Sequence, residues 1–290
     1  MKISIISDEI SPDPETAFEL GTQWGIRCFE LRGVGFERVP VLSPYQEQAL
    51  IESIEMYQVK VVAISPGLFK FAHPGGKRAR FPIAVIDQDL FNGWRNAYDA
   101  ARYHLEEILP KSIQFAQKLG TDLIIIFGFD RGGAPPGEAP EEVLTFLRQA
   151  AEIAAQAKMT LAIEVEEGHW ADTGSHAAEV IRAVDHPALK VNWDPGNAAT
   201  CGEIPYPKGY DAVRHYVQHV HFKDVVLFPD GICHYAVKGD IDWEGQLRAL
   251  AKDRYDGFIS VETHMRPKVK NARAMVKRLK GILFQLGNED

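Results

Sequence analysis

Four residues in the second half of the chain carry side chains of the types that bind metal ions: Glu164, Asp194, His221 and Glu262. Each stands where a short apolar run ends, and their separations of 30, 27 and 41 residues are close to one strand–helix unit. Carboxylates and imidazole suit a divalent ion such as Mn²⁺, Co²⁺ or Mg²⁺, and Zn²⁺ accepts the same ligands. Three carboxylates brought together would repel one another without a cation, so we predict one divalent metal ion. The alternative is four separate charges, each satisfied by a salt bridge.

The elements that must position these residues alternate regularly. Short β-branched or apolar runs each precede a helical pattern, which predicts a parallel sheet. The run DLIIIF is continuously apolar, as buried parallel strands usually are. The expected strands span residues 3–7, 27–31, 60–64, 122–127, 161–165, 189–192, 217–222 and 258–261. The expected helices span residues 15–24, 44–57, 94–119, 140–157, 175–184, 242–251 and 269–286, with an irregular stretch at 206–216.

In a chain of 290 residues, the economical arrangement of eight such units is a closed barrel. We therefore predict the α/β class, with residues 1–290 folded as a single (β/α)8 TIM barrel around a parallel closed sheet. An open, doubly wound sheet is the alternative, although no G-x-G-x-x-G segment follows the first run. Two long interruptions, residues 67–81 and 225–239, are expected as loops on the C-terminal face, where barrel enzymes build their active sites.

Composition limits the partners of the chain. Its 40 acidic and 32 basic residues give a formal charge of −8, which argues against a nucleic-acid partner because phosphate binding needs a basic surface. No segment approaches the ~20 apolar residues of a membrane span. Cys28, Cys201 and Cys233 are too few and too scattered for a disulfide framework. We therefore expect a cytoplasmic protein without a membrane partner.

Six segments resemble one protein family, in the right order along nearly the whole chain: ISDEIS, EVEE, DPGN, HVHFKD, KGDIDW and GFISVE. They are similar to the xylose isomerase-like TIM-barrel superfamily of sugar isomerases and epimerases. The resemblance implies a barrel that binds a divalent metal through the four residues named above. In related ketose epimerases the two glutamates, here Glu164 and Glu262, also transfer the proton. The resemblance further implies a small carbohydrate substrate and favours a homo-oligomer.

The chemistry that this metal set would serve is proton transfer. Moving a proton at a carbon next to a carbonyl creates an enediolate, whose negative oxygens need fixed positive charge. Two carboxylates on opposite faces of the substrate can then remove and return the proton. The leading hypothesis is a metal-dependent isomerase or epimerase of a sugar or sugar phosphate. A lyase or dehydratase acting on a keto sugar, keto-glycoside or cyclic keto acid would use the same ligands. An endonuclease for damaged DNA and a non-catalytic sugar-binding barrel are further alternatives.

Two positions depart from the ketose 3-epimerase pattern. That pattern has a histidine where this chain has Asn197, and an arginine where it has Leu227. Both residues contact substrate in that subgroup. The sequence therefore indicates the type of chemistry better than it indicates the substrate.

Other polar residues near the strand ends are candidates for holding substrate. His219 and Lys223 share the strand parity of His221 and are expected to point into the barrel, with a core histidine and a structural ion pair as alternatives. Arg32 is expected as an oxyanion anchor or as the partner of a nearby carboxylate. The full set of candidates is Arg32, Lys70, Glu166, His169, Asn197, His219, Lys223, Lys238 and His264.

The segment after the third run holds a basic cluster. It could close over the site as a lid through Gly75 and Gly76, receive a phosphorylated or carboxylated substrate, or be a solvated charged loop. Trp170 has two interpretations as well, stacking on a sugar face or packing within its own loop. The cluster consists of Lys70, His73, Lys77, Arg78 and Arg80.

Overall fold

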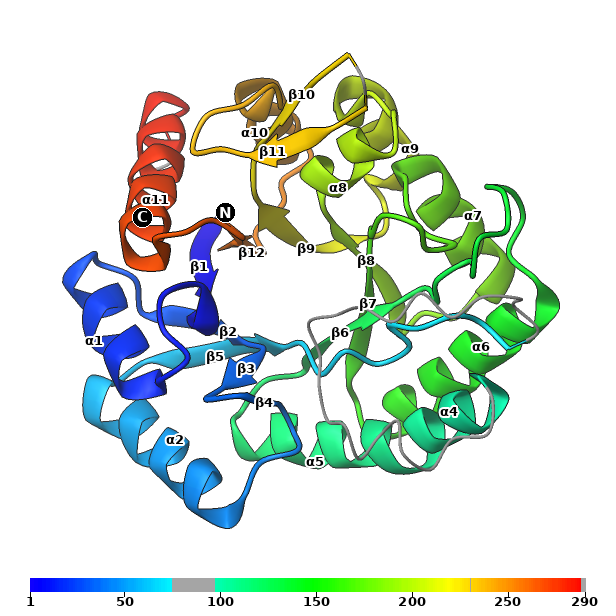
Figure 1. The fold of residues 1–290 in the computed structure, drawn as a ribbon, viewed down its shortest axis with the longest axis horizontal. Helices are drawn as coiled ribbons and strands as arrows, with labels where there is room; N and C mark the ends of the chain where they lie inside the picture. Colours follow the sequence, from blue (N-terminus) through cyan, green and yellow to red (C-terminus); the bar gives the residue numbers. More distant parts are fainter. Residues whose placement is uncertain (75–96, 230, 288–290) are drawn as a thin grey trace.

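The computed structural model describes residues 1–74, 97–229 and 231–287. The barrel strands in these residues are β1 (Lys2–Ile6), β2 (Cys28–Leu31), β5 (Lys60–Ile64), β6 (Leu123–Phe127), β7 (Thr160–Glu164), β8 (Leu189–Trp193), β9 (Val217–Phe222) and β12 (Phe258–Val261). They close in the order β1, β12, β9, β8, β7, β6, β5, β2, and the paired strands run parallel. Figure 1 shows them as an inner ring surrounded by helices. The predicted closed α/β barrel is confirmed, and each predicted strand lies within one residue of the observed one.

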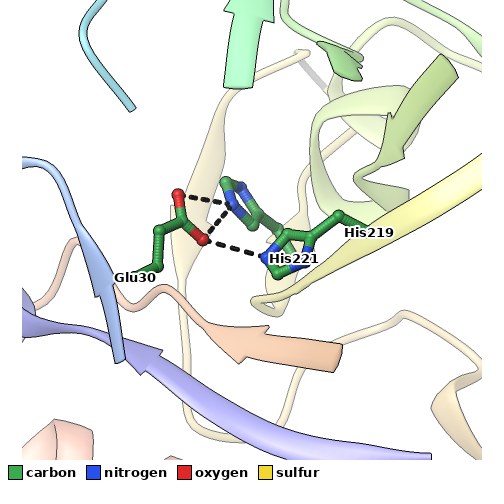
Figure 2. A group of neighbouring side chains, drawn as sticks. All are labelled: Glu30, His219 and His221. Atoms are coloured by element: carbon green, nitrogen blue, oxygen red, sulfur yellow. Dashed lines mark hydrogen bonds and ion pairs between the residues drawn. The ribbon is translucent and has the colours of Figure 1, made fainter. Parts of the chain in front are cut away.

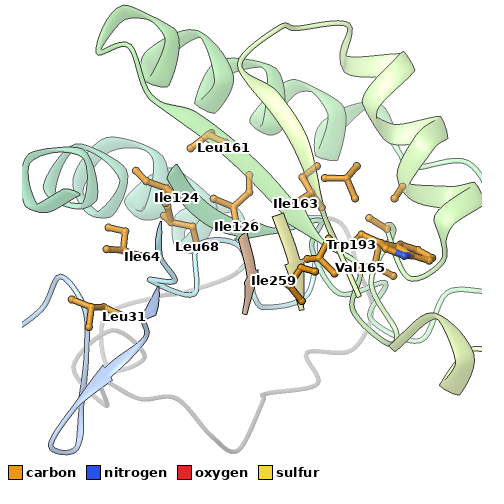
Figure 3. Close-up of a cluster of buried hydrophobic side chains, with 14 of the residues drawn as sticks. Leu31, Ile64, Leu68, Ile124, Ile126, Leu161, Ile163, Val165, Trp193 and Ile259 are labelled. Carbon is orange, nitrogen blue, oxygen red and sulfur yellow. The ribbon is translucent and has the colours of Figure 1, made fainter. Parts of the chain in front are cut away.

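The alternation along β7 explains how one strand serves both the core and the site. Leu161 and Ile163 belong to the large apolar cluster, in which Figure 3 shows them near side chains of the neighbouring strand β6. Ala162, between them, belongs to a separate small cluster, so alternate side chains face opposite sides of the strand. Burying each leucine or isoleucine contributes roughly 1.5–3 kcal/mol. The outward face therefore holds the barrel together, and the inward face is left to carry polar groups such as Glu164.

Side-chain caps begin several of the outer helices. Asp13 accepts the Thr16 amide, Ser43 and Gln46 form a reciprocal capping box, and Asp242 accepts the amide three residues further on. No helix among the described residues is long and apolar enough to cross a membrane. The outer helices include α1 (Pro14–Gln23), α2 (Pro44–Tyr57), α6 (Glu141–Gln156), α7 (Gly174–Val184), α10 (Trp243–Lys252) and α11 (Lys268–Gln285). A 3₁₀ turn spans Ser7–Glu9.

The long helix expected at 94–119 is interrupted. The described part consists of α4 (Ala97–Tyr103), a π-helical turn (His104–Ile108) and α5 (Leu109–Lys118). The interruption directly precedes Pro110, which lacks an amide hydrogen and crowds the carbonyl four residues earlier. The first residues of the expected helix, 94–96, lie outside the described residues.

Seven further short elements among the described residues were not predicted. The expected loop at 225–239 contains a hairpin of β10 (Val225–Leu227) and β11 (Cys233–Tyr235). The expected irregular stretch at 206–216 contains a π-helical turn (Pro205–Gly209) and α9 (Tyr210–Val213). A second hairpin, β3 (Gly33–Val34) with β4 (Glu37–Arg38), follows β2, and α8 (Pro195–Thr200) follows β8. These elements are too short to leave a periodic signal in the sequence.

Candidate metal centre and substrate cavity

The four predicted ligands converge at the carboxyl ends of four consecutive barrel strands. One ligand atom from each lies within 4.8 Å of the others, and all four side chains are buried. His221 Nδ1 stands 3.4 Å from Glu164 Oε1, 3.8 Å from Asp194 Oδ2 and 3.3 Å from Glu262 Oε2. The imidazole nitrogen therefore faces the three carboxylates together.

Local backbone structure aims Asp194 at this point. It follows β8 directly and is the N-cap of α8, where its Oδ1 accepts the Asn197 amide at 2.9 Å. Pro195 at the first helical position favours the helix start, because that position needs no amide donor. Capping thus uses one carboxylate oxygen and leaves Oδ2 for the shared centre.

The four groups fit a divalent cation. Ligand bonds of roughly 2.1 Å place neighbouring and opposite ligand atoms about 3–4 Å apart, which is close to the observed spacing. His221 Nδ1 is buried, and no described residue gives it a hydrogen bond of acceptable geometry. Three carboxylates with one imidazole are a donor set for Mg²⁺, Mn²⁺ or Co²⁺, and Zn²⁺ also accepts it.

Lys223 supplies positive charge beside the same centre. Its Nζ lies 2.9 Å from Asp194 Oδ2 and 2.7 Å from Glu262 Oε2. Burial raises the pKa of Asp194 to about 6, although Lys223 acts in the opposite direction. Burial alone would also raise the pKa of Glu262, but His264, Lys223 and His221 hold it well below its usual value. Lys223 therefore points into the barrel as predicted, and it is paired with two of the predicted ligands.

A second buried layer lies on the other side of His221 (Figure 2). Oε2 of Glu30 is 3.0 Å from His219 Nε2 and 3.1 Å from His221 Nε2. Burial would raise the pKa of Glu30, but the two imidazoles hold it well below its usual range. An ionised Glu30 accepts a hydrogen bond from the Nε2–H of His221, and this contact holds Nδ1 on the side of the three carboxylates. Glu30 therefore orients the imidazole that the centre needs.

Glu30 was not among the site residues predicted from the sequence. It is fully buried between Phe29 and Leu31, whose side chains join the outer apolar cluster. The sequence did contain one indication of its role: Glu30 is a carboxylate inside the apolar run CFEL, and a buried charge needs a partner. The partners, His219 and His221, lie 189 and 191 residues away along the chain and could not be assigned from spacing.

A cavity of about 590 Å³ opens beside the candidate centre. Glu164, His221 and Glu262 line it, so a molecule in the cavity can reach three of the four predicted ligands. Three of the predicted substrate-binding residues, Arg32, Lys70 and His264, also line it, as does Arg38, which was not predicted.

Arg32 lies among carboxylates rather than alone. Its guanidinium is 2.9 Å from Asp8 Oδ2, 2.6 Å from Glu9 Oε1 and 2.6 Å from Glu262 Oε1. His264 Nε2 is 3.1 Å from the same Glu262 oxygen. The ion-pair interpretation of Arg32 is confirmed, and the pair holds Glu262 in the cavity wall. Arg32 also lines the cavity, and its role as an oxyanion anchor stays a prediction.

Lys70, Glu166 and Asn197 form a connected chain. Lys70 Nζ pairs with Glu166 Oε1 at 2.9 Å and lies over the Phe127 ring. Asn197 Nδ2 donates to Glu166 Oε2 at 3.1 Å and to the Val165 carbonyl at 2.8 Å. Asn197 does not line the described cavity, because these contacts hold it under the loop after β7. Asn197 is connected to the cavity residue Lys70 through Glu166.

The other candidates lie away from the described cavity. His219 is part of the buried Glu30 layer, and His169 is buried with Nδ1 3.1 Å from the Glu167 carbonyl. Lys238 is exposed on the turn after β11. Trp170 is buried with its ring edge-on to His73, which is the loop-packing interpretation. Of the basic cluster, Lys77, Arg78 and Arg80 lie outside the described residues, as do the lid glycines Gly75 and Gly76.

Two of the motif segments stabilise the strand that carries His221. Trp243 Nε1 donates to the Lys223 carbonyl at 2.9 Å, and Asp224 Oδ1 accepts the Ile241 amide at 3.1 Å. Arg278 of α11 pairs with the other Asp224 oxygen. The KD and GDIDW segments thus hold the end of β9 in place.

Comparison with known proteins agrees with this architecture. Residues 18–282 match the family model described as a xylose isomerase-like TIM barrel. The chain is 26% identical over 269 residues to L-ribulose-5-phosphate 3-epimerase UlaE of Escherichia coli O157:H7, covering 86% of this chain and 84% of that protein.

Two solved structures share the fold at low identity. The probable 3-DHS dehydratase AsbF of Bacillus anthracis superposes with a TM-score of 0.69 at 17% identity, covering 97% of this chain and 99% of the other. A xylose isomerase-like TIM barrel protein of Mycobacterium smegmatis in complex with magnesium has a TM-score of 0.66 at 14% identity, covering 93% and 88%. From the match over residues 18–282, this chain belongs to the xylose isomerase-like TIM barrel family.

Proposed function

We propose that this chain is a divalent-metal-dependent isomerase or epimerase of a sugar or sugar phosphate. The observation that carries the proposal is the convergence of Glu164, Asp194, His221 and Glu262 beside a cavity of about 590 Å³. The epimerase activity named for the 26% identical relative supports the same reaction class. The proposal includes one ion per chain, with Mn²⁺, Co²⁺ or Mg²⁺ preferred over Zn²⁺, a single domain over residues 1–290 and a cytoplasmic, homo-oligomeric enzyme.

Glu164 and Glu262 are the proposed proton-transfer pair. A divalent ion held by the four ligands would supply fixed positive charge where negative charge develops on the oxygens of the substrate. The carboxylate of Glu262, held ionised by Arg32 and Lys223, takes the proton from a carbon next to the carbonyl. Glu164, from the strand across the cavity, returns a proton to that carbon or its neighbour. Return to the opposite face of the same carbon gives an epimer, and return to the neighbouring carbon gives an isomer.

A lyase or dehydratase is the second candidate. His264 lines the cavity, is one-third exposed and lies 3.1 Å from Glu262. An imidazole in that position can protonate a leaving hydroxyl after Glu262 has removed the neighbouring proton. The same residues would then expel water instead of returning the proton.

Incubation of the Mn²⁺-loaded protein with a panel of keto sugars and their phosphates in D2O, followed by NMR, separates these functions. An isomerase or epimerase introduces deuterium at a carbon next to the carbonyl and conserves the mass of the carbon skeleton. A dehydratase releases water and leaves an unsaturated or keto product. Neither exchange nor elimination across the panel would contradict both.

A further inference from the structure

Arg38 is a cavity residue whose guanidinium pairs with no carboxylate among the described residues. It lies on β4, in the short hairpin after β2, and lines the same cavity as Glu164 and Glu262. Its Nε donates to the Ser65 carbonyl at 2.8 Å and its Nη2 donates to the Ser65 hydroxyl at 3.1 Å. Both partners are neutral oxygens. Nη1 has no acceptor among the described residues, so its two hydrogens remain available to a ligand.

Two other cations of this cavity wall differ from Arg38: Arg32 pairs with three carboxylates, and Lys70 pairs with Glu166. Arg266 and Lys268 also line the cavity and, like Arg38, have no carboxylate partner among the described residues. For Arg38, no carboxylate of the described residues lies within ion-pair distance. Burial, with the nearby positive charge of Arg32, lowers the pKa of Arg38 to about 10. Arg38 is half-buried, and a partly desolvated guanidinium without a counter-ion is stabilised when an anion binds to it.

The backbone around Arg38 is built to admit its guanidinium. Gly67 has φ +78°, and a Cβ added there would lie 3.0 Å from Arg38 Nε and 3.2 Å from Cζ. A side chain at position 67 would therefore push the guanidinium away from Ser65. Glycine at this position satisfies the left-handed backbone and keeps the space open.

We propose that Arg38 forms a subsite for an oxyanion, a phosphate or carboxylate carried by a substrate in the cavity that Glu164 and Glu262 also line. A planar guanidinium with two free hydrogens on Nη1 matches either group. The inference rests on the proposed function for the identity of the substrate as a keto sugar, and it narrows that class to anionic members. Neutral ketoses would leave the Arg38 charge uncompensated.

The test is a binding measurement that does not need turnover. In EDTA, where no metal competes for the anion, the binding of inorganic phosphate, D-ribulose 5-phosphate, D-ribonate and neutral D-ribulose is titrated by calorimetry against wild type, Arg38→Gln and Gly67→Ala. Arg102→Gln, which alters an exposed arginine on α4, is the matched control. Loss of a charge-assisted hydrogen bond lowers affinity about tenfold or more.

We expect wild type and Arg102→Gln to bind the phosphate ester, the aldonate or both more tightly than neutral D-ribulose. We expect Arg38→Gln to lose at least tenfold in the affinity for the anionic ligand and Gly67→Ala to lose affinity in the same direction. The phosphate and carboxylate arms tell which oxyanion is preferred. Equal affinity of Arg38→Gln and wild type for every anion would overturn the subsite. Failure of the deuterium test with anion binding intact would instead overturn the proposed function.

Discussion

His221 Nε2 lies 3.1 Å from Oε2 of Glu30, on the side of the imidazole opposite the three carboxylates that face Nδ1. One residue therefore joins a fully buried orienting carboxylate to the candidate metal centre. Outer carboxylates of this kind fix the tautomer of a ligating histidine and raise its basicity. The contact between Glu30 and His221 leads to a prediction about the affinity for divalent metal ions.

Replacing Glu30 by glutamine should weaken divalent metal binding about 10–100-fold without unfolding the barrel. The amide keeps the shape of the carboxylate but removes the negative charge that orients both imidazoles. Calorimetric titration with Mn²⁺ measures the change. Glu244→Gln, an exposed substitution on α10, is the matched control. Equal Mn²⁺ affinity in Glu30→Gln and wild type would remove Glu30 from the centre.

Replacing Lys223 by methionine should destabilise the metal-free protein more than the Mn²⁺-loaded protein. Without Lys223 the buried carboxylate of Asp194 loses its nearest cation and Glu262 loses one of its two close cations, a loss of about 3–5 kcal/mol in the free energy of unfolding. A bound divalent ion would replace much of that charge. Denaturant unfolding in EDTA and in Mn²⁺ measures both values.

Lys118→Met supplies the comparison for Lys223, because it removes an exposed lysine paired with Glu47. That substitution should change the free energy of unfolding by about 1 kcal/mol or less, equally with and without Mn²⁺. The same deficit for Lys223→Met in EDTA and in Mn²⁺ would show that no ion shares its carboxylates.

Replacing Glu262 by glutamine should retain the fold and reduce deuterium exchange into substrate at least about 100-fold. Glutamine can keep hydrogen bonds to Arg32 and Lys223, but its amide cannot accept the substrate proton. The measurement is exchange at saturating Mn²⁺, so that weaker metal binding does not account for the loss. Undiminished exchange would exclude Glu262 from the proton-transfer pair.

Outside the site, stability should depend on pH through His176. Its Nδ1 lies 2.7 Å from Asp172 Oδ1, and the hydrogen bond to this carboxylate raises the pKa of His176 above its usual 6.5. A raised folded-state pKa stabilises the protein fully below about 6.5, and this contribution disappears as the pH rises through the folded value. The Tm difference between wild type and His176→Gln should therefore be largest near pH 6 and smaller near pH 9.

The exposed His234→Gln variant is the control for this pH series. Its Tm difference from wild type should not follow the same trend. A Tm difference for His176→Gln that is constant from pH 6 to pH 9 would contradict the role of the Asp172 pair.

The barrel and the grouping of the four predicted ligands could be predicted because both follow local rules. Apolar runs recur at one strand–helix unit, and parallel strands bring their carboxyl ends to one rim. A polar residue at each end, such as Asp194 after β8, must then lie near the others. Family resemblance named the same four positions independently.

The remaining site residues depend on contacts between distant segments. Glu30 meets His221 across 191 residues, and Arg32 meets Glu262 across 230 residues. Arg38 stands on a strand of two residues, which leaves no periodic pattern. His169 and Lys238 are polar residues near strand ends, but burial under a loop and exposure on a turn keep them from the described cavity. A position near a strand end in the sequence therefore predicts that a residue lies at the carboxyl end of the barrel. It does not predict whether the side chain points into the cavity.

The most direct test of the metal centre is the anomalous difference density of a crystal of this protein soaked in Mn²⁺. Two other groups, Glu30 with His219 and His221, and Glu9 with Glu262 and His264, also bring ligand atoms together. We expect a single strong peak at about 2.0–2.4 Å from the ligand atoms of Glu164, Asp194, His221 and Glu262. A peak in one of the other two groups, or no peak with Lys223 Nζ still bridging Asp194 and Glu262, would contradict the account.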